Sequence, residues 1–499
     1  MKKTLNLFLH VSLSISALAS HPNIVYILAD DMGVGDVSCL NSEAKLHTPN
    51  LDKLAAGGAV FTDAHTSSSV CTPTRYGLLT GRYSWRSELK ARVVDGYGKS
   101  VIRDGIDTVP ALLKRNGYQT AMIGKWHLGM KWSRKDGNAI TEYRPGSIGN
   151  EIDFSKPFES GPTDHGFDYF FGINASLDFP PYTWLENDSV VGIPEIQRPG
   201  QGGKSKGEPQ LMMRGGLQVN DFRPELILKG LTKKAVDYVD SLSKERPFFL
   251  YMPLNAPHTP VVPRDPFLGT SDCGIYGDFI HEIDWSVGEI VSALQERGLL
   301  ENTLIIFTAD NGASRASFPD DFEEKYGHKP SSVYKGRKAS LDEGGHRVPF
   351  IANWPGVVEP GSRVDVAFCL NDLYATCADI VAEVIAEDAG VDSFNMLPLL
   401  KGNIAEYSRN GLVHHDFIGR FAFREGDWKL NMGKEAKSKA LYNLGSSLAE
   451  KENLIKKHPV IAEQLEAKLN AIILNGRSTD GPKLSNEGPE IWDELYWLK

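Results

Sequence analysis

Four apolar, β-branched runs recur along the chain, and each ends in polar residues. They are Asn23–Ala29 before Asp30 and Asp31, Gln119–Ile123 before Gly124 to His127, Phe248–Met252 before Asn255 to His258, and Thr303–Ala309 before Asp310 and Asn311. Continuous apolar runs of this kind predict strands that are buried on both faces, as in a parallel sheet.

Helical patterns lie between these runs. Leu51–Ala56 and Val109–Asn116 are short, and Phe279–Arg297 is longer, with apolar residues at helical spacing. Alternating strands and helices predict an α/β fold with a large, mostly parallel sheet flanked by helices. Ligands of such folds bind beyond the carboxyl ends of the strands. The polar residues that follow the four runs are therefore expected around one cleft: Asp30, Asp31, Lys125, His127, His258, Asp310 and Asn311.

The pattern of the sequence changes after about Phe394. Short strands are expected at Gly411–Val413, Arg420–Arg424 and Trp428–Asn431, followed by a helix at Pro459–Leu474. These elements predict a small C-terminal α+β subdomain over residues 394–499, after a main domain over residues 20–393. The stretch 187–224, rich in Gly, Pro, Gln and Lys, is expected to be a long surface excursion near the cleft.

The N-terminus has the pattern of a secretory signal peptide. Lys2 and Lys3 precede an apolar stretch from Leu5 to Ile15, and Ala17-Leu18-Ala19 offers small residues for cleavage. The apolar stretch is short for a membrane-spanning helix, which needs about 20 residues. We expect residues 1–19 to be removed and the protein to be periplasmic or secreted, with no membrane span afterwards. The alternatives are an uncleaved anchor and a buried first helix.

Charge and cysteine content exclude some classes of function and of metal site. The 499 residues carry a formal net charge of -10, which becomes -10 - 2 = -12 without Lys2 and Lys3. This balance argues against a general nucleic-acid binder, but clustered cations can still attract an anionic substrate to a cleft. There are five cysteines, and none has CxxC or zinc-type spacing. With Cys71 set aside, Cys39, Cys273, Cys369 and Cys377 leave three possible pairings open.

The first chemical prediction is a metal site. Asp30, Asp31, Asp310 and Asn311 offer only oxygen ligands, which favours a hard cation such as calcium or magnesium over zinc. Adjacent carboxylates at a buried strand end repel each other unless a cation or a proton compensates. The alternative is that these side chains cap helices or turns.

The segment from Cys71 to Gly81 resembles the sulfatase signature C-x-P-x-R-x-x-x-x-T-G at every fixed position. Further motifs along the chain are similar to segments of the same family. They are Asp30 to Gly33, Gly124 to Gly129, Ala256 to Pro260, Asp310 to Gly312, Lys335 to Pro349, and Leu441 to Leu444 with Glu452 to Leu454. Asn443 departs from the aspartate usual at its position, and we expect no effect on catalysis.

The resemblance implies an alkaline-phosphatase-like fold and a formylglycine-dependent sulfatase. In that family a maturation enzyme oxidises the signature cysteine, here Cys71, to Cα-formylglycine, whose hydrate attacks sulfur. It also implies that calcium is held by Asp30, Asp31, Asp310 and Asn311 together with a formylglycine oxygen at position 71.

The resemblance assigns roles to the remaining polar residues of the cleft. Arg75 and Lys125 would stabilise the formylglycine hydrate, and Asp310 would help deprotonate it. Lys338 and His258 would bind sulfate and help protonate the leaving alcohol. His127 would remove the proton that lets sulfate leave, because a histidine can titrate near neutral pH.

The expected substrate is a sulfated saccharide, with galactose or N-acetylgalactosamine 6-sulfate as the candidates. Ser176 and Asp178 lie where sulfatases often contact substrate, and both are predicted substrate ligands. Two alternatives stay open: a phosphate or phosphonate ester hydrolase of the same superfamily, and a non-catalytic glycan-binding protein with an unmodified Cys71.

Overall fold

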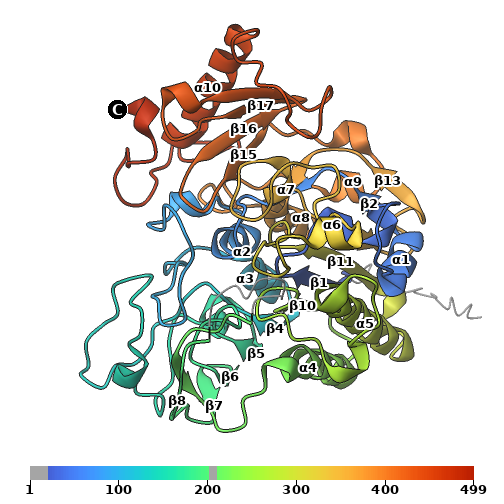
Figure 1. Ribbon diagram of the computed structural model, residues 1–499, viewed down its shortest axis with the longest axis vertical. Helices are drawn as coiled ribbons and strands as arrows, with labels where there is room; N and C mark the ends of the chain where they lie inside the picture. The colour runs from blue at the N-terminus through green and yellow to red at the C-terminus, as the bar shows by residue number, and fades with distance from the viewer. Residues whose placement is uncertain (1–20, 202–210) are drawn as a thin grey trace, which may run out of the picture.

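A ten-stranded sheet forms the centre of the protein (Figure 1). The computed structural model describes residues 21–201 and 211–499. The five middle strands are all parallel, in the order β11 (Thr303–Ala309), β1 (Asn23–Ala29), β10 (Phe248–Pro253), β4 (Gln119–Lys125) and β5 (Tyr169–Ile173). Every residue of β1, β10 and β11 is buried, as continuous apolar runs require. The four predicted strands are confirmed.

Antiparallel strands extend the sheet at both edges, so the sheet as a whole is mixed. On one side β12 (Phe350–Asn353) and β2 (Ala59–Phe61) pair antiparallel, and β13 (Ser362–Val364) then pairs parallel with β2. On the other side β6 (Trp184–Glu186) and β7 (Ser189–Val191) continue antiparallel from β5.

Two groups of helices flank the sheet. Helices α1 (Pro49–Ala56), α4 (Ile227–Ser241) and α5 (Gly274–Glu296) pack together, as do α2 (Cys71–Thr80), α3 (Val109–Arg115) and α8 (Leu373–Ile380). Figure 1 shows the sheet between the two groups. Helix α5 buries Ile283, Val287 and Ile290 at helical spacing, which explains its amphipathic sequence.

A separate four-stranded antiparallel sheet forms the C-terminal part. Its strands are β15 (Leu412–His415), β16 (Phe421–Glu425), β17 (Trp428–Asn431) and β18 (Ala440–Asn443), and α10 (Pro459–Leu474) packs on β16 and β17. The short helix α9 (Leu397–Leu400) still packs in the core of the large sheet, so the small sheet begins after it. The boundary at residue 394 stays a prediction.

The remaining expectations have mixed outcomes. The segment 187–224 contains a hairpin of β8 (Ile196–Arg198) and β9 (Gly216–Gln218) and contributes Met212 and Arg214 to the main cleft. The predicted signal peptide lies outside the described residues. Within residues 21–201 and 211–499, no helix is long and apolar enough to cross a membrane. The five cysteines form no disulfide.

Candidate active site

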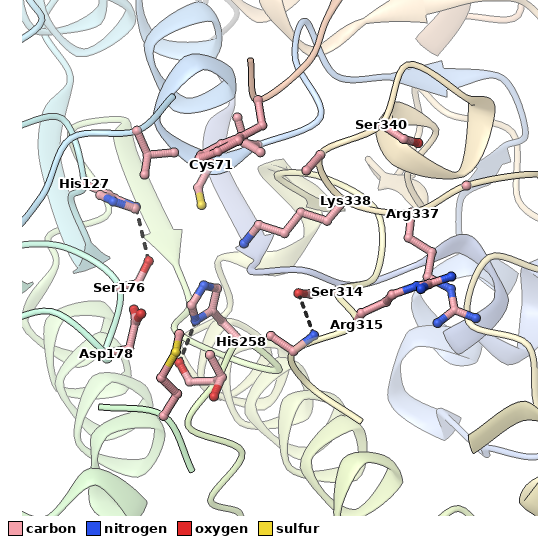
Figure 2. Close-up of a pocket in the computed structure, with 18 of the residues that line it drawn as sticks. Cys71, His127, Ser176, Asp178, His258, Ser314, Arg315, Arg337, Lys338 and Ser340 are labelled. Atoms are coloured by element: carbon pink, nitrogen blue, oxygen red, sulfur yellow. Dashed lines mark hydrogen bonds between the residues drawn. The ribbon is translucent and has the colours of Figure 1, made fainter. Parts of the chain in front are cut away.

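Cys71 begins helix α2 beside a cleft of about 750 Å³. The helix ends at Gly81, whose φ of 64° gives the left-handed cap that glycine adopts at no steric cost. The Cys71 side chain is 2% exposed, and burial raises the pKa of its thiol. Figure 2 shows Cys71 pointing into the space between His127, His258 and Lys338.

The carboxyl ends of β1, β4 and β11 meet beside Cys71. Lys125 at the end of β4 donates from Nζ to Asp30 Oδ2 at 2.6 Å. Arg75, one turn into α2, donates from Nε and Nη2 to Asp310 Oδ2 at 3.0 and 2.7 Å. All four side chains are fully buried. Burial alone would raise the pKa of Asp30, but the nearby Lys125, with Arg75, holds it below its usual value.

Asp31 connects the strand ends to the opposite wall of the cleft. Lys338 Nζ lies 2.6 Å from Asp31 Oδ1, and His258 Nε2 lies 3.7 Å from Asp31 Oδ2. Asn311 donates from Nδ2 to Asp31 Oδ1 at 2.7 Å. Although burial would lower the pKa of Lys338, the nearby carboxylates raise it, so Lys338 remains a cation. Asp31 has a φ of 70°, an uncommon backbone conformation for a residue other than glycine.

His127 is held as a neutral imidazole. Its Nε2 lies 2.9 Å from the carbonyl oxygen of Val94, an atom that can only accept, so Nε2 carries the proton. Its Nδ1 therefore has a lone pair, which lies 3.3 Å from Ser176 Oγ. Burial, with Lys125 and Arg75 nearby, holds the pKa of His127 well below its usual value. The φ of 58° at His127 is uncommon, and such backbone strain clusters at functional sites.

Ser176 and Asp178 both lie in the cleft, but their contacts differ (Figure 2). Ser176 is hydrogen-bonded to His127. Asp178 forms an ion pair with Arg214 through Oδ2, while its Oδ1 is buried without a hydrogen-bond partner among the described residues. Arg214 lies 3.8 Å over the ring of Phe179. Asp178 therefore has one acceptor atom to offer to a ligand, whereas the hydroxyl of Ser176 is engaged within the site.

The predicted metal ligands fit a hard cation. Asp30 Oδ1 and Asn311 Oδ1 are buried and lack a hydrogen-bond partner in the described part of the chain. Ligand atoms of Asp30, Asp31, Cys71 and His258 lie within 4.8 Å of one another. Carboxylate and amide oxygens are the donors that Ca²⁺ takes, and a buried oxygen without a partner is costly unless something binds it.

Several cleft residues were not predicted from the sequence. Arg144, Arg315 and Arg337 line the outer part of the cleft, and Figure 2 shows the side chains of Arg315 and Arg337 close together. Arg337 is paired with Glu323. Arg144 and Arg315 lie on loops outside any recognisable motif, so only their charge could have drawn attention to them, and Arg337 lies within the Lys335 to Pro349 segment but was given no role.

The sulfatase family profile matches residues 22–384, most of the chain. The chain belongs to the sulfatase family. An N-acetylgalactosamine-6-O-sulfatase of Bacteroides thetaiotaomicron is 34% identical over 497 residues, covering 90% of this chain and 93% of that protein. The N-acetylgalactosamine-6-sulfatase of Homo sapiens is 33% identical over 393 residues, covering 77% of this chain and 67% of its own length.

Solved structures agree with the fold. A Bacteroides thetaiotaomicron structure, described in work on the metabolism of multiple glycosaminoglycans, has a TM-score of 0.80 at 32% identity and covers 91% of this chain and 99% of its own. The phosphonate monoester hydrolase of Agrobacterium radiobacter has a TM-score of 0.60 at 17% identity, covers 90% and 95%, and shares the fold. The predicted family and the alkaline-phosphatase-like architecture are confirmed, and this sulfatase is a sulfuric ester hydrolase.

Proposed function

We propose that this sulfatase releases sulfate from a sulfated glycan, with N-acetylgalactosamine 6-sulfate or galactose 6-sulfate at the cleaved position. The placement of Cys71 carries the proposal, because its side chain points into a cleft between Lys338, His127 and His258. Two relatives named as N-acetylgalactosamine 6-sulfatases support the sugar. Such an activity would serve polysaccharide degradation.

The proposal includes two groups that the protein would acquire. Oxidation of Cys71 to formylglycine by a maturation enzyme would supply an oxygen nucleophile as the aldehyde hydrate. Calcium held by Asp30, Asp31, Asp310 and Asn311, together with the oxygen at position 71, would supply fixed positive charge against the sulfate oxygens. The donor set and the unpartnered oxygens of Asp30 and Asn311 support this choice of ion.

The chain's own residues would bind sulfate and move protons. Lys338 and His258, both at the cleft wall beside Asp31, would contact the sulfate and the leaving oxygen, where negative charge develops. Arg75 donates two hydrogen bonds to Asp310 Oδ2 and so fixes the orientation of that carboxylate. His127 offers a neutral Nδ1 that can accept a proton within the cleft, which is the property a general base needs.

The outer cleft supports a sugar substrate. Asp178 Oδ1 can accept a hydrogen bond from a sugar hydroxyl, since it has no partner of its own among the described residues. Arg144 and Arg315 give the rim a positive character that suits a polyanionic chain, whereas the charge of Arg337 is balanced by Glu323. We also propose that the enzyme is exported through residues 1–19, which N-terminal sequencing of the mature protein would test.

Mass spectrometry of the peptide that contains Cys71, from protein co-produced with a maturation enzyme, is the first test. Replacement of CH2SH by CHO lowers the peptide mass, and sulfate release from 6-sulfated saccharides should follow. An unmodified thiol despite an active maturation enzyme, with glycan affinity but no turnover, would favour a binding protein instead. Faster turnover of aryl phosphate than of aryl sulfate would favour a phosphate or phosphonate esterase.

A further inference from the structure

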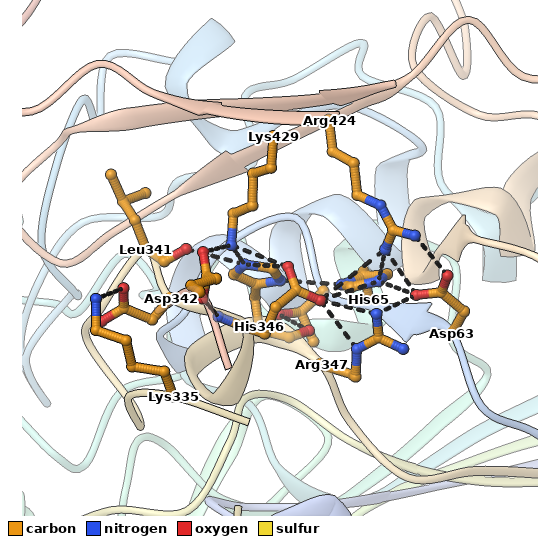
Figure 3. Close-up of polar contacts among 12 residues, drawn as sticks. Asp63, His65, Lys335, Leu341, Asp342, His346, Arg347, Arg424 and Lys429 are labelled. Carbon is orange, nitrogen blue, oxygen red and sulfur yellow. Dashed lines mark hydrogen bonds and ion pairs between the residues drawn. The ribbon is translucent and has the colours of Figure 1, made fainter. Parts of the chain in front are cut away.

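A buried polar network joins the C-terminal sheet to the two segments that carry Cys71 and Lys338 (Figure 3). Strand β3 (Ala64–His65) leads towards Cys71, and helix α7 (Glu343–His346) follows Lys338. From the C-terminal sheet, Arg424 of β16 and Lys429 of β17 reach down to these segments, as Figure 3 shows.

Lys429 sets the direction of the hydrogen bonds in this network. Its Nζ donates to Glu343 Oε1 at 2.9 Å and to His346 Nε2 at 3.0 Å, and it lies 3.0 Å from Glu450 Oε1. An ammonium group has no lone pair, so His346 Nε2 must accept. The single proton of neutral His346 then lies on Nδ1.

The remaining protons follow from that assignment. His346 Nδ1 lies 3.0 Å from His65 Nδ1, so His346 donates and His65 accepts. His65 Nε2 then donates to Asp63 Oδ1 at 2.6 Å, the shorter of its two contacts; Arg424 Nη1, which donates to the same carboxylate, also lies 3.0 Å from that nitrogen. The opposite tautomer of His346 would donate from Nε2 to the carbonyl oxygen of Leu341 at 3.1 Å, but it would turn an N–H towards the Lys429 ammonium 3.0 Å away. Burial lowers the pKa of His65 to about 4 and that of His346 well below its usual value, so both rings are neutral.

A metal ion is a poorer explanation of this histidine cluster. Nitrogens of His65, His346 and His414 lie within 4.8 Å of one another. However, the rings of His346 and His414 are stacked face to face, with centroids 3.7 Å apart and an interplanar angle of 11°. A ring nitrogen binds a metal in the plane of its ring, and two stacked parallel planes do not meet at one ion. The hydrogen-bonded chain from Lys429 to Asp63 needs no ion.

The far end of the chain is also tied to the C-terminal sheet. Arg424 donates from Nη1 and Nη2 to the two oxygens of Asp63, both at 2.7 Å. Arg347 lies 2.7 Å from Asp63 and donates from Nε to Glu343 Oε2 at 2.9 Å. The network balances three carboxylates against three cations: Asp63, Glu343 and Glu450 against Arg347, Arg424 and Lys429. A buried network balanced in this way fixes side-chain and backbone geometry.

Backbone hydrogen bonds carry this geometry to the active site. Thr66 N–H donates to the His346 carbonyl at 2.8 Å, and Ala339 N–H donates to the Ser69 carbonyl at 2.8 Å. The Cys71 and Lys338 segments are therefore bonded to each other at two points. Ser69 N–H also donates to the His415 carbonyl of β15 at 2.9 Å.

We propose that Lys429 and Arg424 are positioning residues. Through them the C-terminal sheet holds Lys338 and the nucleophile at position 71 at the relative positions that catalysis needs. This inference rests on the proposed function, since it concerns the same site. Neither residue touches the substrate cleft. Removing the network should therefore disturb the chemical step at a distance, and misplacement by about 1 Å can cost roughly 100-fold in rate.

The test compares two double variants of the full-length, matured enzyme. Lys429→Met with Glu450→Gln removes one cation and one carboxylate, so the buried charge stays balanced. Lys468→Met with Glu425→Gln removes an ion pair of the same subdomain whose side chains are 52% and 40% exposed, and serves as the control. Steady-state kinetics on an aryl sulfate and on a sugar 6-sulfate are combined with amide hydrogen exchange by mass spectrometry.

We expect kcat of the network variant to fall about 100-fold on the sugar sulfate, with a smaller loss on the aryl sulfate, whose leaving group needs less protonation by Lys338. Amides of residues 64–71 and 338–347 should exchange faster than in the control variant. If the double variant fails to fold, Arg424→Lys takes its place in the test. This variant keeps the charge but loses the bidentate contact with Asp63, and it should give a smaller loss of kcat in the same direction.

Three results would overturn the inference. They are unchanged kcat in a folded network variant, unchanged exchange in both segments, and stoichiometric metal bound at His65 and His346. If wild-type enzyme with converted Cys71 releases no sulfate, the proposed function fails, and the exchange measurement still decides whether the network holds the two segments.

Discussion

Two neighbouring residues of the cleft should affect different kinetic parameters when they are changed. Ser176 is hydrogen-bonded to His127 Nδ1, whereas Asp178 Oδ1 has no hydrogen-bond partner among the described residues. Ser176→Ala should therefore disturb the orientation of His127 and lower kcat with little change in KM. Asp178→Asn should weaken sugar binding and lower kcat/KM for a saccharide substrate.

The contacts set the expected magnitudes. The 3.3 Å contact of Ser176 joins two neutral groups, and such a hydrogen bond contributes about 0.5–1.5 kcal/mol, or roughly 2- to 12-fold in rate. A hydrogen bond from a sugar hydroxyl to the Asp178 carboxylate is charge-assisted and contributes about 1.5–3 kcal/mol, or roughly 10- to 150-fold. Arg214 is 41% exposed, so water can solvate it when its partner becomes neutral.

The assay measures kcat and KM for both variants on a sugar 6-sulfate and on an aryl sulfate. Asp178→Asn should leave aryl sulfate turnover nearly unchanged, because that substrate has no sugar hydroxyl. Ser176→Ala should lower kcat on both substrates. The reasoning fails if Ser176→Ala raises KM at constant kcat, or if Asp178→Asn slows both substrates equally.

Three further predictions concern the ion, the rim and the core. Chelation should lower activity and melting temperature, and calcium at about 100 times its Kd should restore about 2.7 kcal/mol of stability in thermal unfolding, whereas zinc should not. Arg315→Ala should lower kcat/KM for oligosaccharides that carry a second anionic group by up to roughly 5-fold, the size expected for an exposed charge. It should not lower kcat/KM for a monosaccharide, and added salt should remove the difference between the variant and the wild type. Arg86 donates to both oxygens of Asp392 at 2.6 and 2.7 Å with both side chains fully buried, so Arg86→Met should cost about 3–5 kcal/mol in denaturant unfolding near neutral pH. Burial raises the pKa of Asp392, but Arg86 and other donors lower it overall. The stabilisation that ionised Asp392 contributes is therefore present above its unfolded pKa of about 3.9 and is lost as the pH falls through the lower folded pKa. Without Arg86, burial raises the folded pKa of Asp392, so the difference in unfolding free energy between variant and wild type should shrink towards about pH 4.

The sequence predicted those parts of the protein that depend on local pattern. The strands β1, β4, β10 and β11 are continuous apolar runs, and a run buried on both faces can form little else than a central strand. Because parallel strands end at the same edge, the polar residues after them had to meet, and Asp30, Lys125 and Asp310 do. The antiparallel edges, formed by strands as short as Ala59–Phe61, carry no comparable signal.

What the sequence could not predict depends on side chains that meet only after folding. Ser176 is predicted to bind substrate from its place in the chain, and nothing in that place indicates the contact of its hydroxyl with His127, which the loop after β5 makes. The network of Asp63, Glu343 and Lys429 joins three distant segments. Asp63 and Lys429 each resemble an ordinary surface charge, and the motif that contains Glu343 does not reveal its partners. Burial converts these charges into constraints, since an unpaired charge in the interior is costly and each must find its partner. The C-terminal sheet supplies those partners, so its contribution to the active site lies in pairings across the chain and in no motif of its own.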